Sequence, residues 1–277
     1  HVNINKIAIL GSGSMGTAIL SGLLQAGFDA GAITVSTKSA ASAVKLATEM
    51  GVTSFSAEGN ADANSRAVEG ADVVLVAVKP MYVTQVLAEV AGALSPRALV
   101  ISVAAGITNA AMEASVPASV AVIRAMPNTP AIVGRAVTGL ARGGRATDAQ
   151  LTNAVSLFET VGKVVVLDES KIDELTSISG SGPAYVFFLI EQLTAAAVEL
   201  GFDAETASLL VSETFLGASE LLVSSGKTPA ELRRQVTSPN GTTERAIGVL
   251  SEGGLAQLFE RATRAAVARA KEISAGN

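Results

Sequence analysis

The stretch KIAILGSGSMG, residues 6–16, decides the fold class of this chain. Its first part is a short run rich in apolar and β-branched residues, and apolar residues recur at helical spacing from residue 18 to residue 26. Between them, Gly11, Gly13 and Gly16 fit the pattern G-x-G-x-x-G. The first glycine of that pattern permits a tight turn, the second lets the backbone approach a pyrophosphate, and the third lets the helix pack closely on the strand. This order indicates a dinucleotide-binding unit, with an ordinary glycine-rich turn as the alternative.

More strand-like runs follow in the first half of the chain. They are β-branched and almost continuously apolar, which is typical of parallel strands buried on both faces. The runs occupy residues 32–36, 72–78, 98–103, 119–124 and 163–167. We therefore expect a Rossmann-like, doubly wound and mostly parallel α/β sheet in residues 1–166. Helical periodicity takes over from residue 168, so residues 167–277 are expected to form an all-α domain.

The composition limits the classes of function that remain. The chain has 277 residues, of which 49% are hydrophobic, and a net charge of −5. It has no cysteine, which excludes a disulfide and a thiol nucleophile, and its one histidine is His1. The acidic charge and the lack of tryptophan and of a Lys/Arg cluster argue against nucleic-acid binding. The sequence has no uninterrupted apolar run of roughly 18 residues, no secretion leader and no metal-ligand spacing, so we expect a cytoplasmic protein without membrane or metal sites.

The end of the second strand-like run favours one cofactor over another. In NAD-binding versions of this fold an acidic residue holds the ribose hydroxyls at that position. Here the run ends in Ser36, Thr37, Lys38 and Ser39, which offer hydroxyls and an ammonium group to a 2′-phosphate and no carboxylate to repel it. We expect NADP(H), with NADH accepted more weakly; a solvated turn is the other interpretation of these residues.

Three loops follow later strand-like runs and are candidates for the cofactor crevice, because ligands of such sheets bind at the carboxyl ends of the strands. They are AVKP at residues 77–80, SVAAGIT at residues 102–108 and RAMPNTP at residues 124–130. Lys79 in the first loop is equally a candidate for a surface lysine. Two prolines stiffen the third loop and hold its polar residues in fixed directions, although a purely structural turn has the same spacing.

The helical half contains a segment that is too apolar to be solvated. Residues 183–200 predict a helix that begins at Pro183 and is apolar on almost every face. A domain of roughly 110 residues seldom encloses such a helix completely. We therefore expect a homodimer in which a second copy covers part of it. The segments 203–224 and 255–273 predict two further helices, the last of them a solvated outer element.

The stretch VTSPNGTTERA, residues 236–246, carries an unusual number of small hydroxyl residues. Its SPNG sequence suits a four-residue turn, and Thr242 can open a helix. A turn that leads into a helix start leaves backbone N–H groups that can hold an anion. A simple capped helix is the alternative.

Taken together and in this order, GSGSMG, AVKP, SVAAGIT, RAMPNTP, SGSGPAY and VTSPNGTT resemble the motifs of the pyrroline-5-carboxylate reductases. The resemblance covers nearly the whole chain, and the last two motifs are its specific part. It implies an NADPH-dependent reduction of the cyclic imine 1-pyrroline-5-carboxylate to L-proline, the last step of proline biosynthesis. It also implies a dimer with intertwined helical domains, and it leaves a ring of dimers open.

The resemblance further implies roles for individual residues. The cofactor would have its pyrophosphate at the glycine turn, its 2′-phosphate after the second strand and its adenosine near Asn64. The cofactor residues are Gly11, Ser12, Gly13, Ser14, Met15, Ser36, Thr37, Lys38, Ser39, Asn64, Ala77, Val78, Lys79, Pro80, Val103, Ala104 and Ala105. The substrate would be held by Ser238, Gly241, Thr242 and Thr243.

A cyclic imine is basic enough to be partly protonated near neutral pH, so its reduction requires orientation more than a strong acid. Backbone N–H groups around Gly241, Thr242 and Thr243 would hold the substrate carboxylate, and the Thr243 hydroxyl would hydrogen-bond the ring nitrogen as the catalytic contact. This arrangement suits a chain without a usable His or Cys. The source of the proton is open.

Two positions depart from the family pattern. Asn240 stands where the family often has glycine, but asparagine tolerates the left-handed conformation, so we expect the turn to survive. Arg234 stands where the family often has an acid, so no role of an acid carries over to it.

Other functions can be compared by sequence. A β-hydroxyacid dehydrogenase shares the two-domain plan but has a catalytic lysine where this chain has Val186. Another imine reductase and a non-enzymatic NADP-sensing protein are the remaining alternatives.

Overall fold

The structure, a computed structural model, describes residues 3–277 and contains an eight-stranded β-sheet in the order β3-β2-β1-β4-β5-β6-β7-β8. Among the described strands, every neighbouring pair is parallel except β6 with β7. The strands are Ile7–Leu10 (β1), Ile33–Thr37 (β2), Thr53–Ser56 (β3), Val73–Val76 (β4), Leu99–Ser102 (β5), Ala121–Met126 (β6), Ala136–Arg142 (β7) and Gly162–Val166 (β8). The expected mostly parallel sheet is confirmed, and β3 and β7 are additional strands that the apolar runs do not predict.

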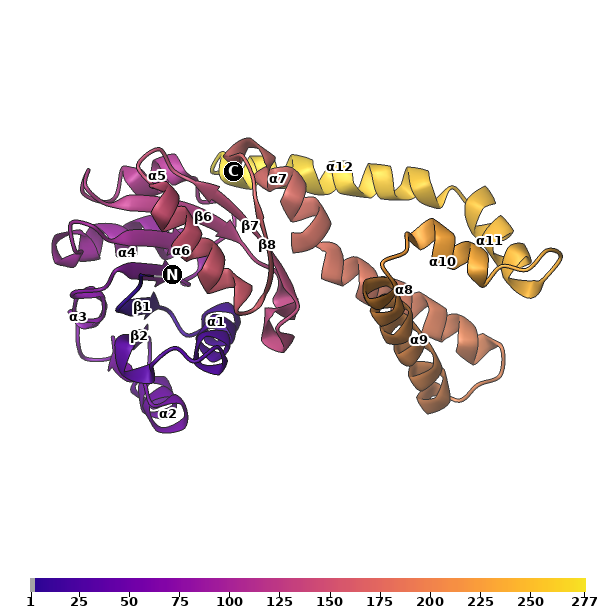
Figure 1. Ribbon diagram of the computed structural model, residues 1–277, viewed down its shortest axis with the longest axis horizontal. Helices are drawn as coiled ribbons and strands as arrows, with labels where there is room; N and C mark the ends of the chain where they lie inside the picture. The colour runs from indigo at the N-terminus through magenta and orange to yellow at the C-terminus, as the bar shows by residue number, and fades with distance from the viewer. Residues whose placement is uncertain (1–2) are drawn as a thin grey trace. The chain divides into compact units, whose positions relative to one another are not determined.

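The sheet is buried on both faces because successive strand positions are apolar. In β1, Ile7 and Ile9 belong to one hydrophobic cluster, while Ala8 and Leu10 belong to another on the opposite face. Helices α1, α2 and α6 contribute side chains to the first cluster, and α3, α4 and α5 to the second (Figure 1). These helices span Ser14–Gln25 (α1), Ala40–Met50 (α2), Ala63–Val68 (α3), Val83–Val90 (α4), Asn109–Glu113 (α5) and Asp148–Glu159 (α6). The arrangement is the doubly wound one that the sequence predicts.

The turn between β1 and α1 brings backbone segments into close contact. Gly11 has a φ of 102°, which residues other than glycine rarely adopt. A Cβ at Gly11 would lie 2.7 Å from the carbonyl oxygen of Ala77, just after β4, and a Cβ at Gly16 would lie 2.7 Å from the carbonyl oxygen of Gly11. The first and third glycines of the motif therefore hold the first turn of α1 against the end of β4.

The chain forms two compact units, and each is described by itself. The first consists of residues 3–181 together with Ala266–Asn277, and the second of Gly182–Ala265. Short helical turns complete the first unit: Ala30–Ala32, Pro80–Tyr82, Ala91–Ala93, Thr129–Val133, Glu169–Lys171, the helix α7 (Ile172–Leu175) and the π-helical turn Thr176–Gly180. By packing, residues 167–181 thus belong with the sheet. The boundary at residue 166 follows the change from strands to helices, and as a division between functional domains it stays a prediction.

The last turn of α12 (Leu255–Ser274) is fixed to the sheet by polar and apolar contacts. The buried Arg124 donates a hydrogen bond to the Ser274 hydroxyl at 3.5 Å and pairs with Glu169 at 3.6 Å. A Cβ at Gly106 would lie 2.6 Å from a methyl carbon of Ile273, so the loop after β5 touches the same turn. The interpretation of this helix as wholly solvated is therefore wrong at its end, because its final residues pack against the first unit.

The second unit consists of helices whose ends match the sequence signals. Helix α9 begins after Asp203, whose carboxylate accepts a hydrogen bond from the N–H of Thr206, and it ends at Gly226 with a φ of 66°. Both ends are where the sequence predicts them. The helices are Gly182–Glu199 (α8), Ala204–Ser225 (α9), Pro229–Gln235 (α10), Thr242–Glu252 (α11) and the first part of α12.

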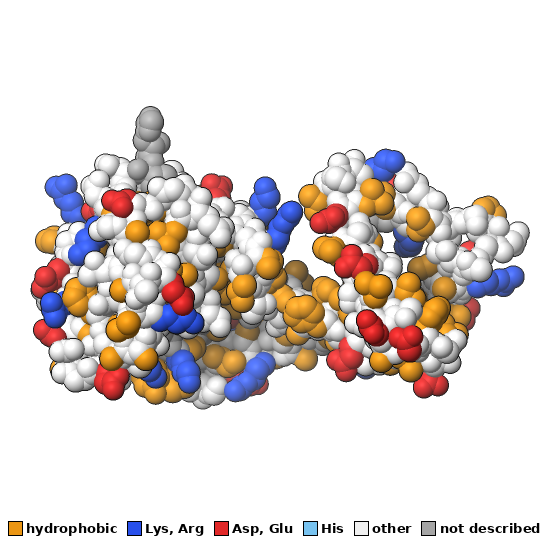
Figure 2. Space-filling model, turned by 90° about the horizontal axis from the view of Figure 1, so that it is seen from below, with side chains coloured by type: hydrophobic (Ala, Val, Ile, Leu, Met, Phe, Trp, Pro, Cys, Tyr) orange, Lys and Arg blue, Asp and Glu red, His pale blue; other side chains and the backbone are white. Residues whose placement is uncertain are grey.

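The helical unit leaves many large apolar side chains exposed. No residue of α8, all of which the structure describes, is buried. Phe187 is 64% exposed and Phe188 is 60% exposed, and α9 adds further exposed leucines. Figure 2 shows hydrophobic side chains at several places on the surface. The α8 face cannot be covered from within this unit, in agreement with the expectation of a second copy.

Among the described helices, α9 is long and apolar enough to cross a membrane by length and composition. Its three glutamates, Glu205, Glu213 and Glu220, recur after about two turns each and therefore lie near one side of the helix. Carboxylates in such a row are costly inside a lipid bilayer. The pattern fits a helix with one face covered by protein and another in water.

Replacing Phe187 and Phe188 together by Glu should dissociate the expected dimer. Each phenylalanine buried at an interface contributes about 1.5–3 kcal/mol, so the dissociation constant should rise by at least about 100-fold. Sedimentation velocity across a dilution series measures the change. The matched control is Val44→Glu, at an exposed apolar position of α2 in the first unit, which should leave the dimer intact. A wild-type chain that is monomeric and active throughout the series would contradict the prediction.

Candidate active site

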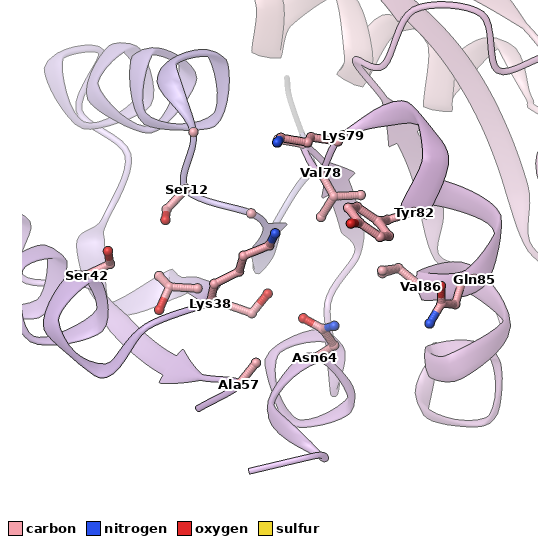
Figure 3. A pocket seen from close by; sticks show the side chains of 15 residues that line it. Ser12, Lys38, Ser42, Ala57, Asn64, Val78, Lys79, Tyr82, Gln85 and Val86 are labelled. Atoms are coloured by element: carbon pink, nitrogen blue, oxygen red, sulfur yellow. The ribbon is translucent and has the colours of Figure 1, made fainter. Parts of the chain in front are cut away.

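A cavity of about 630 Å³ lies at the carboxyl ends of β1, β2 and β4. Strand β1 lies between the other two. The chain first adds β2 and β3 on one side of β1 and then adds β4 and β5 on its other side, so the strand order reverses at β1. Such a switch point is where ligands bind in open α/β sheets. In Figure 3, the side chains of Lys38, Asn64 and Tyr82 surround the same space.

Most of the residues predicted for the cofactor line this cavity. They are Gly11, Ser12, Gly13, Ser36, Thr37, Lys38, Asn64, Ala77, Val78 and Lys79. The other predicted residues are not part of its lining: Ser14 and Met15 in the first turn of α1, Ser39 before α2, Pro80 in the turn before α4, and Val103, Ala104 and Ala105 after β5. The fold thus gathers sequence-distant residues at one edge of the sheet.

The start of α1 fits a pyrophosphate group. Gly13 is the N-cap residue of α1, and no side chain caps the helix there. A Cβ at Gly13 would meet no heavy atom of residues 3–277 within 4 Å, whereas a Cβ at Gly11 or Gly16 would meet backbone atoms. Packing inside the chain therefore does not require glycine at this position. A ligand that approaches the backbone and accepts hydrogen bonds from the helix start does require it.

The end of β2 carries one cation and a set of hydroxyl groups. The Thr37 hydroxyl donates to the carbonyl oxygen of Ser39 at 2.8 Å, and the Ser39 hydroxyl accepts from the N–H of Ser42 at 3.1 Å and so caps α2. The Lys38 ammonium lies 5.2 Å from the centre of the Tyr82 ring. Thr37 and Ser39 therefore shape the loop, and Lys38 supplies the charge at this corner of the cavity.

Five lining residues were not predicted from the sequence: Ser42, Ala57, Tyr82, Gln85 and Val86. Ser42 stands three positions after Ser39, a spacing typical of the first turn of a helix, and could have been found on that signal. Tyr82 follows AVKP closely and is one of only two tyrosines in the sequence. The other three carry no chemical signal and reach the cavity through the placement of β3 and α4.

The loop after β6 is held by the side chain of Asn128. Its amide nitrogen donates to the carbonyl oxygen of Ser179 at 2.9 Å, and its amide oxygen accepts from the N–H of Val137 at 2.9 Å. Asn128 thus ties the RAMPNTP loop to the start of β7 and to the π-helical turn. These contacts support the structural interpretation of this loop.

The start of α11 presents backbone donors without a side-chain cap. The N-cap residue is Gly241, which has no side chain, so Thr242 and Thr243 are the first two helical residues. Among the described residues, Thr243 is half-buried and its hydroxyl forms no hydrogen bond. The simple capped helix is therefore wrong for these threonines, and the free N–H groups suit an anion.

The turn before α11 survives the departure at residue 240. Asn240 has a φ of 60° and is the one non-glycine residue with positive φ in the described part of the chain. Its N–H donates to the Glu244 carboxylate at 2.7 Å, and the N–H of Gly241 donates to the carbonyl oxygen of Ser238 at 3.0 Å. The expectation that asparagine replaces glycine here is confirmed.

Three further charged residues of the helical unit, Asp203, Glu231 and Arg234, lie near the ends of α9 and α10. Hydrogen bonds from Thr206 lower the pKa of Asp203, and hydrogen bonds from the N–H and hydroxyl of Thr228 lower the pKa of Glu231. Arg234 is exposed and forms no ion pair with any of residues 3–277. These groups stabilise or solvate helix ends and do not line the cavity at the sheet edge.

Each of the two units contains residues that match a known protein family. Residues 169–273 match the family described as pyrroline-5-carboxylate reductase dimerisation. Residues 6–106 match the family described as NADP oxidoreductase, coenzyme F420-dependent. The first match includes the whole helical unit with the exposed face of α8. The second includes the glycine turn and the loops after β2 and β4.

Three proteins that are similar along nearly the whole chain are pyrroline carboxylate reductases. The chain is 41% identical over 270 residues to a pyrroline-5-carboxylate reductase of Pseudomonas aeruginosa, with 97% of each chain covered. A solved pyrroline-5-carboxylate reductase of Coxiella burnetii is 38% identical, with a TM-score of 0.92 over 98% of this chain and 99% of that one. The Plasmodium falciparum pyrroline carboxylate reductase, solved with NADP bound, is 26% identical, with a TM-score of 0.82 over 99% of each chain. With its glycine turn, its helical dimerisation region and these relatives along its whole length, the chain belongs to the pyrroline-5-carboxylate reductase family.

Proposed function

We propose that the protein reduces 1-pyrroline-5-carboxylate to L-proline with NADPH. The observation that carries the cofactor assignment is the lining of the cavity at the switch point, which contains Lys38 and Lys79 and no carboxylate. A positive and hydroxyl-rich lining favours a cofactor with a phosphate on its ribose over one with free hydroxyls. NADH would bind more weakly, because it has no group to pair with Lys38.

The proposed cofactor contacts follow the strand ends. Gly11 to Met15 would hold the pyrophosphate, with the N–H groups at the start of α1 as donors. Ser36 to Ser39 would hold the 2′-phosphate, and Asn64 would contact the adenosine side. Ala77 to Pro80 and Val103 to Ala105 would lie along the rest of the cofactor. When bound, NADPH supplies the hydride for the C=N carbon.

The proposed substrate contacts are at the start of α11. The N–H groups of Thr242 and Thr243, with Gly241 and Ser238 in the preceding turn, would hold the carboxylate of the substrate. The Thr243 hydroxyl, which has no partner among the described residues, would hydrogen-bond the ring nitrogen. The substrate binds as its protonated iminium form, so solvent supplies the proton before the hydride is transferred. The chain then has to orient two reactants rather than provide an acid.

Two competing functions are less well supported. A β-hydroxyacid dehydrogenase needs a proton-transferring lysine at the position of Val186, whose side chain cannot transfer a proton. A non-enzymatic NADP-sensing protein would have no use for the free threonine and open helix start of α11. Reduction of other cyclic imines at the same site is compatible with the proposal, since the carboxylate contact alone selects among them.

The proposed assembly is a homodimer through the helical unit, in which the exposed faces of α8 and α9 meet a second copy. A ring of such dimers would bury further apolar surface of the same unit. We place the protein in the cytoplasm, with neither nucleic acid nor a membrane as a partner.

The reaction can be tested directly by following the absorbance of NADPH with 1-pyrroline-5-carboxylate as substrate. We expect turnover with NADPH and slower turnover with NADH at equal concentration. A cyclic imine without the carboxylate serves as the substrate control, and it should react poorly because the helix start has no anion to hold. No turnover with either cofactor would remove the enzymatic function.

Replacing Lys38 by Met should lower the affinity for NADPH and leave that for NADH unchanged. Methionine keeps the length and apolar stem but loses the charge, and a hydrogen bond to a charged group contributes about 1.5–3 kcal/mol, or about 10- to 100-fold in the dissociation constant. Fluorescence titration with both cofactors measures the effect. Lys45→Met, at an exposed position on α2, is the matched control. Equal losses for NADPH and NADH would contradict a contact with the 2′-phosphate.

Replacing Thr243 by Ala should lower kcat/KM and leave the affinity for NADPH nearly unchanged. The Thr243 hydroxyl would accept a hydrogen bond from the iminium N–H, and loss of a hydrogen bond to a charged group costs about 1.5–3 kcal/mol, or about 10- to 100-fold in kcat/KM. Thr243→Ser keeps the hydroxyl and should restore much of the activity. The melting temperature should not change, because Gly241 and not Thr243 is the N-cap residue.

The control for that change is Thr263→Ala in α12, where the hydroxyl donates to the carbonyl oxygen of Phe259 at 2.8 Å and lies in no proposed contact. This variant should keep full kcat/KM. If Thr243→Ala instead retained wild-type kcat/KM while its melting temperature fell, the residue would be structural.

A further inference from the structure

A carboxylate lies beside the cofactor cavity, next to residues that line it. The side chain of Glu58, in the loop after β3, accepts a hydrogen bond from the backbone N–H of Ala40 at 2.8 Å. Ala40 is the first residue of α2, directly after the N-cap residue Ser39. The N–H of Glu58 donates to the Ser56 hydroxyl at 3.1 Å, which fixes the loop in this position. Glu58 is therefore attached to the start of α2 although the two residues come from different connections of the sheet.

The occupied N–H group is at the corner proposed for the 2′-phosphate. Lys38 and Ser42, on either side of Ala40 in sequence, line the cavity, and so does Ala57, the neighbour of Glu58. A phosphate that binds at a helix start uses the same backbone donors that a carboxylate uses. The Glu58 carboxylate thus stands where a ligand oxygen would accept its hydrogen bond.

The charge of Glu58 is not neutralised by a neighbour. Among the described residues, no lysine or arginine forms an ion pair with it. Lys38, the lysine that lines the cavity closest in sequence to Ala40, lies over the Tyr82 ring instead. A phosphate in this corner would therefore meet an unpaired negative charge and would have to displace it from the N–H of Ala40.

The hydrogen bond is not needed to cap α2. The Ser39 hydroxyl already accepts from the N–H of Ser42, which is the usual side-chain cap of a helix start. A carboxylate beside the first helical N–H adds a favourable interaction with the helix dipole, but only while no other anion is present. Its presence beside the cavity thus affects the cofactor more than the fold.

We propose that Glu58 determines cofactor preference by competing with the 2′-phosphate of NADPH for the start of α2. The inference rests on the proposed function, in which Ser36 to Ser39 hold that phosphate. Binding of NADPH moves the carboxylate away from Ala40, and binding of NADH leaves it in place. The side chain therefore weakens NADPH binding and narrows the difference between the two cofactors.

Glu58→Gln tests the proposal because glutamine keeps the size and a hydrogen-bond acceptor but removes the charge. The dissociation constants of NADPH and NADH are measured by fluorescence titration of the full-length protein without substrate. We expect the variant to bind NADPH about three- to fivefold more tightly, the effect of one charge near a helix start, and to bind NADH within about twofold of wild type. Titration with 2′,5′-ADP should show the same gain and titration with 5′-AMP none.

Glu49→Gln, an exposed glutamate of α2 that lies outside the cavity lining, is the control for a general change of charge and should alter neither constant. Glu58→Ala, which also removes the acceptor, should tighten NADPH binding in the same way. If both Glu58 variants bind NADPH as tightly as wild type or more weakly, the proposal for Glu58 is overturned. The proposed function still stands in that case, provided that the wild-type protein prefers NADPH to NADH. A wild-type protein that binds NADPH no more tightly than NADH overturns the proposed preference for NADPH, and the two Glu58 variants then decide the present proposal separately.

Discussion

The close approach of three backbone segments at Ala77 is the contact on which the rest of the first unit depends. The carbonyl oxygen of Ala77 lies where a side chain at residue 11 would have to be, and the carbonyl oxygen of Gly11 lies where one at residue 16 would be. This contact makes β1 and β4 neighbours and points the first turn of α1 at their shared edge. The cavity opens at that edge because the chain continues from β1 in opposite directions across the sheet.

The chemistry of the protein relies on backbone donors and hydroxyl groups more than on acids and bases. The sequence contains no cysteine and a single histidine at its first position. Two helix starts without side-chain caps, at Gly13 and at Gly241, offer N–H groups to anions. One lies in each compact unit, so the cofactor and the substrate carboxylate are assigned the same kind of binding group. A reduction that needs orientation and charge complementarity can be served by such groups alone.

The sequence predicted the elements whose signals are local. The glycine turn, the caps of α9 and the opening of α11 depend on residues within a few positions of one another, and each is found where the pattern indicates. Strand β3 was missed because its sequence, TSFS, is polar and lies at the edge of the sheet. Strand β7 was missed because Gly139 interrupts its apolar pattern, and a Cβ there would lie 2.6 Å from a methyl carbon of Leu175 in α7. Tyr82 lines the cavity, and Glu58 lies beside it, because strands that are distant in sequence pair in the sheet. No local sequence pattern predicts such pairing.

The chain leaves the first unit at residue 181 and returns to it at residue 266, so the helical unit is inserted into the sheet unit and does not simply follow it. A single proteolytic cut within α9 or α10 would therefore leave both fragments anchored in the same folded body, one through the sheet and the other through Ile273 and Ser274. Loss of the last few residues has the opposite effect, because it frees one of the two tethers and uncovers the loop after β5. The last turn of α12 is thus a closing element of the sheet unit, although the helix begins in the helical unit.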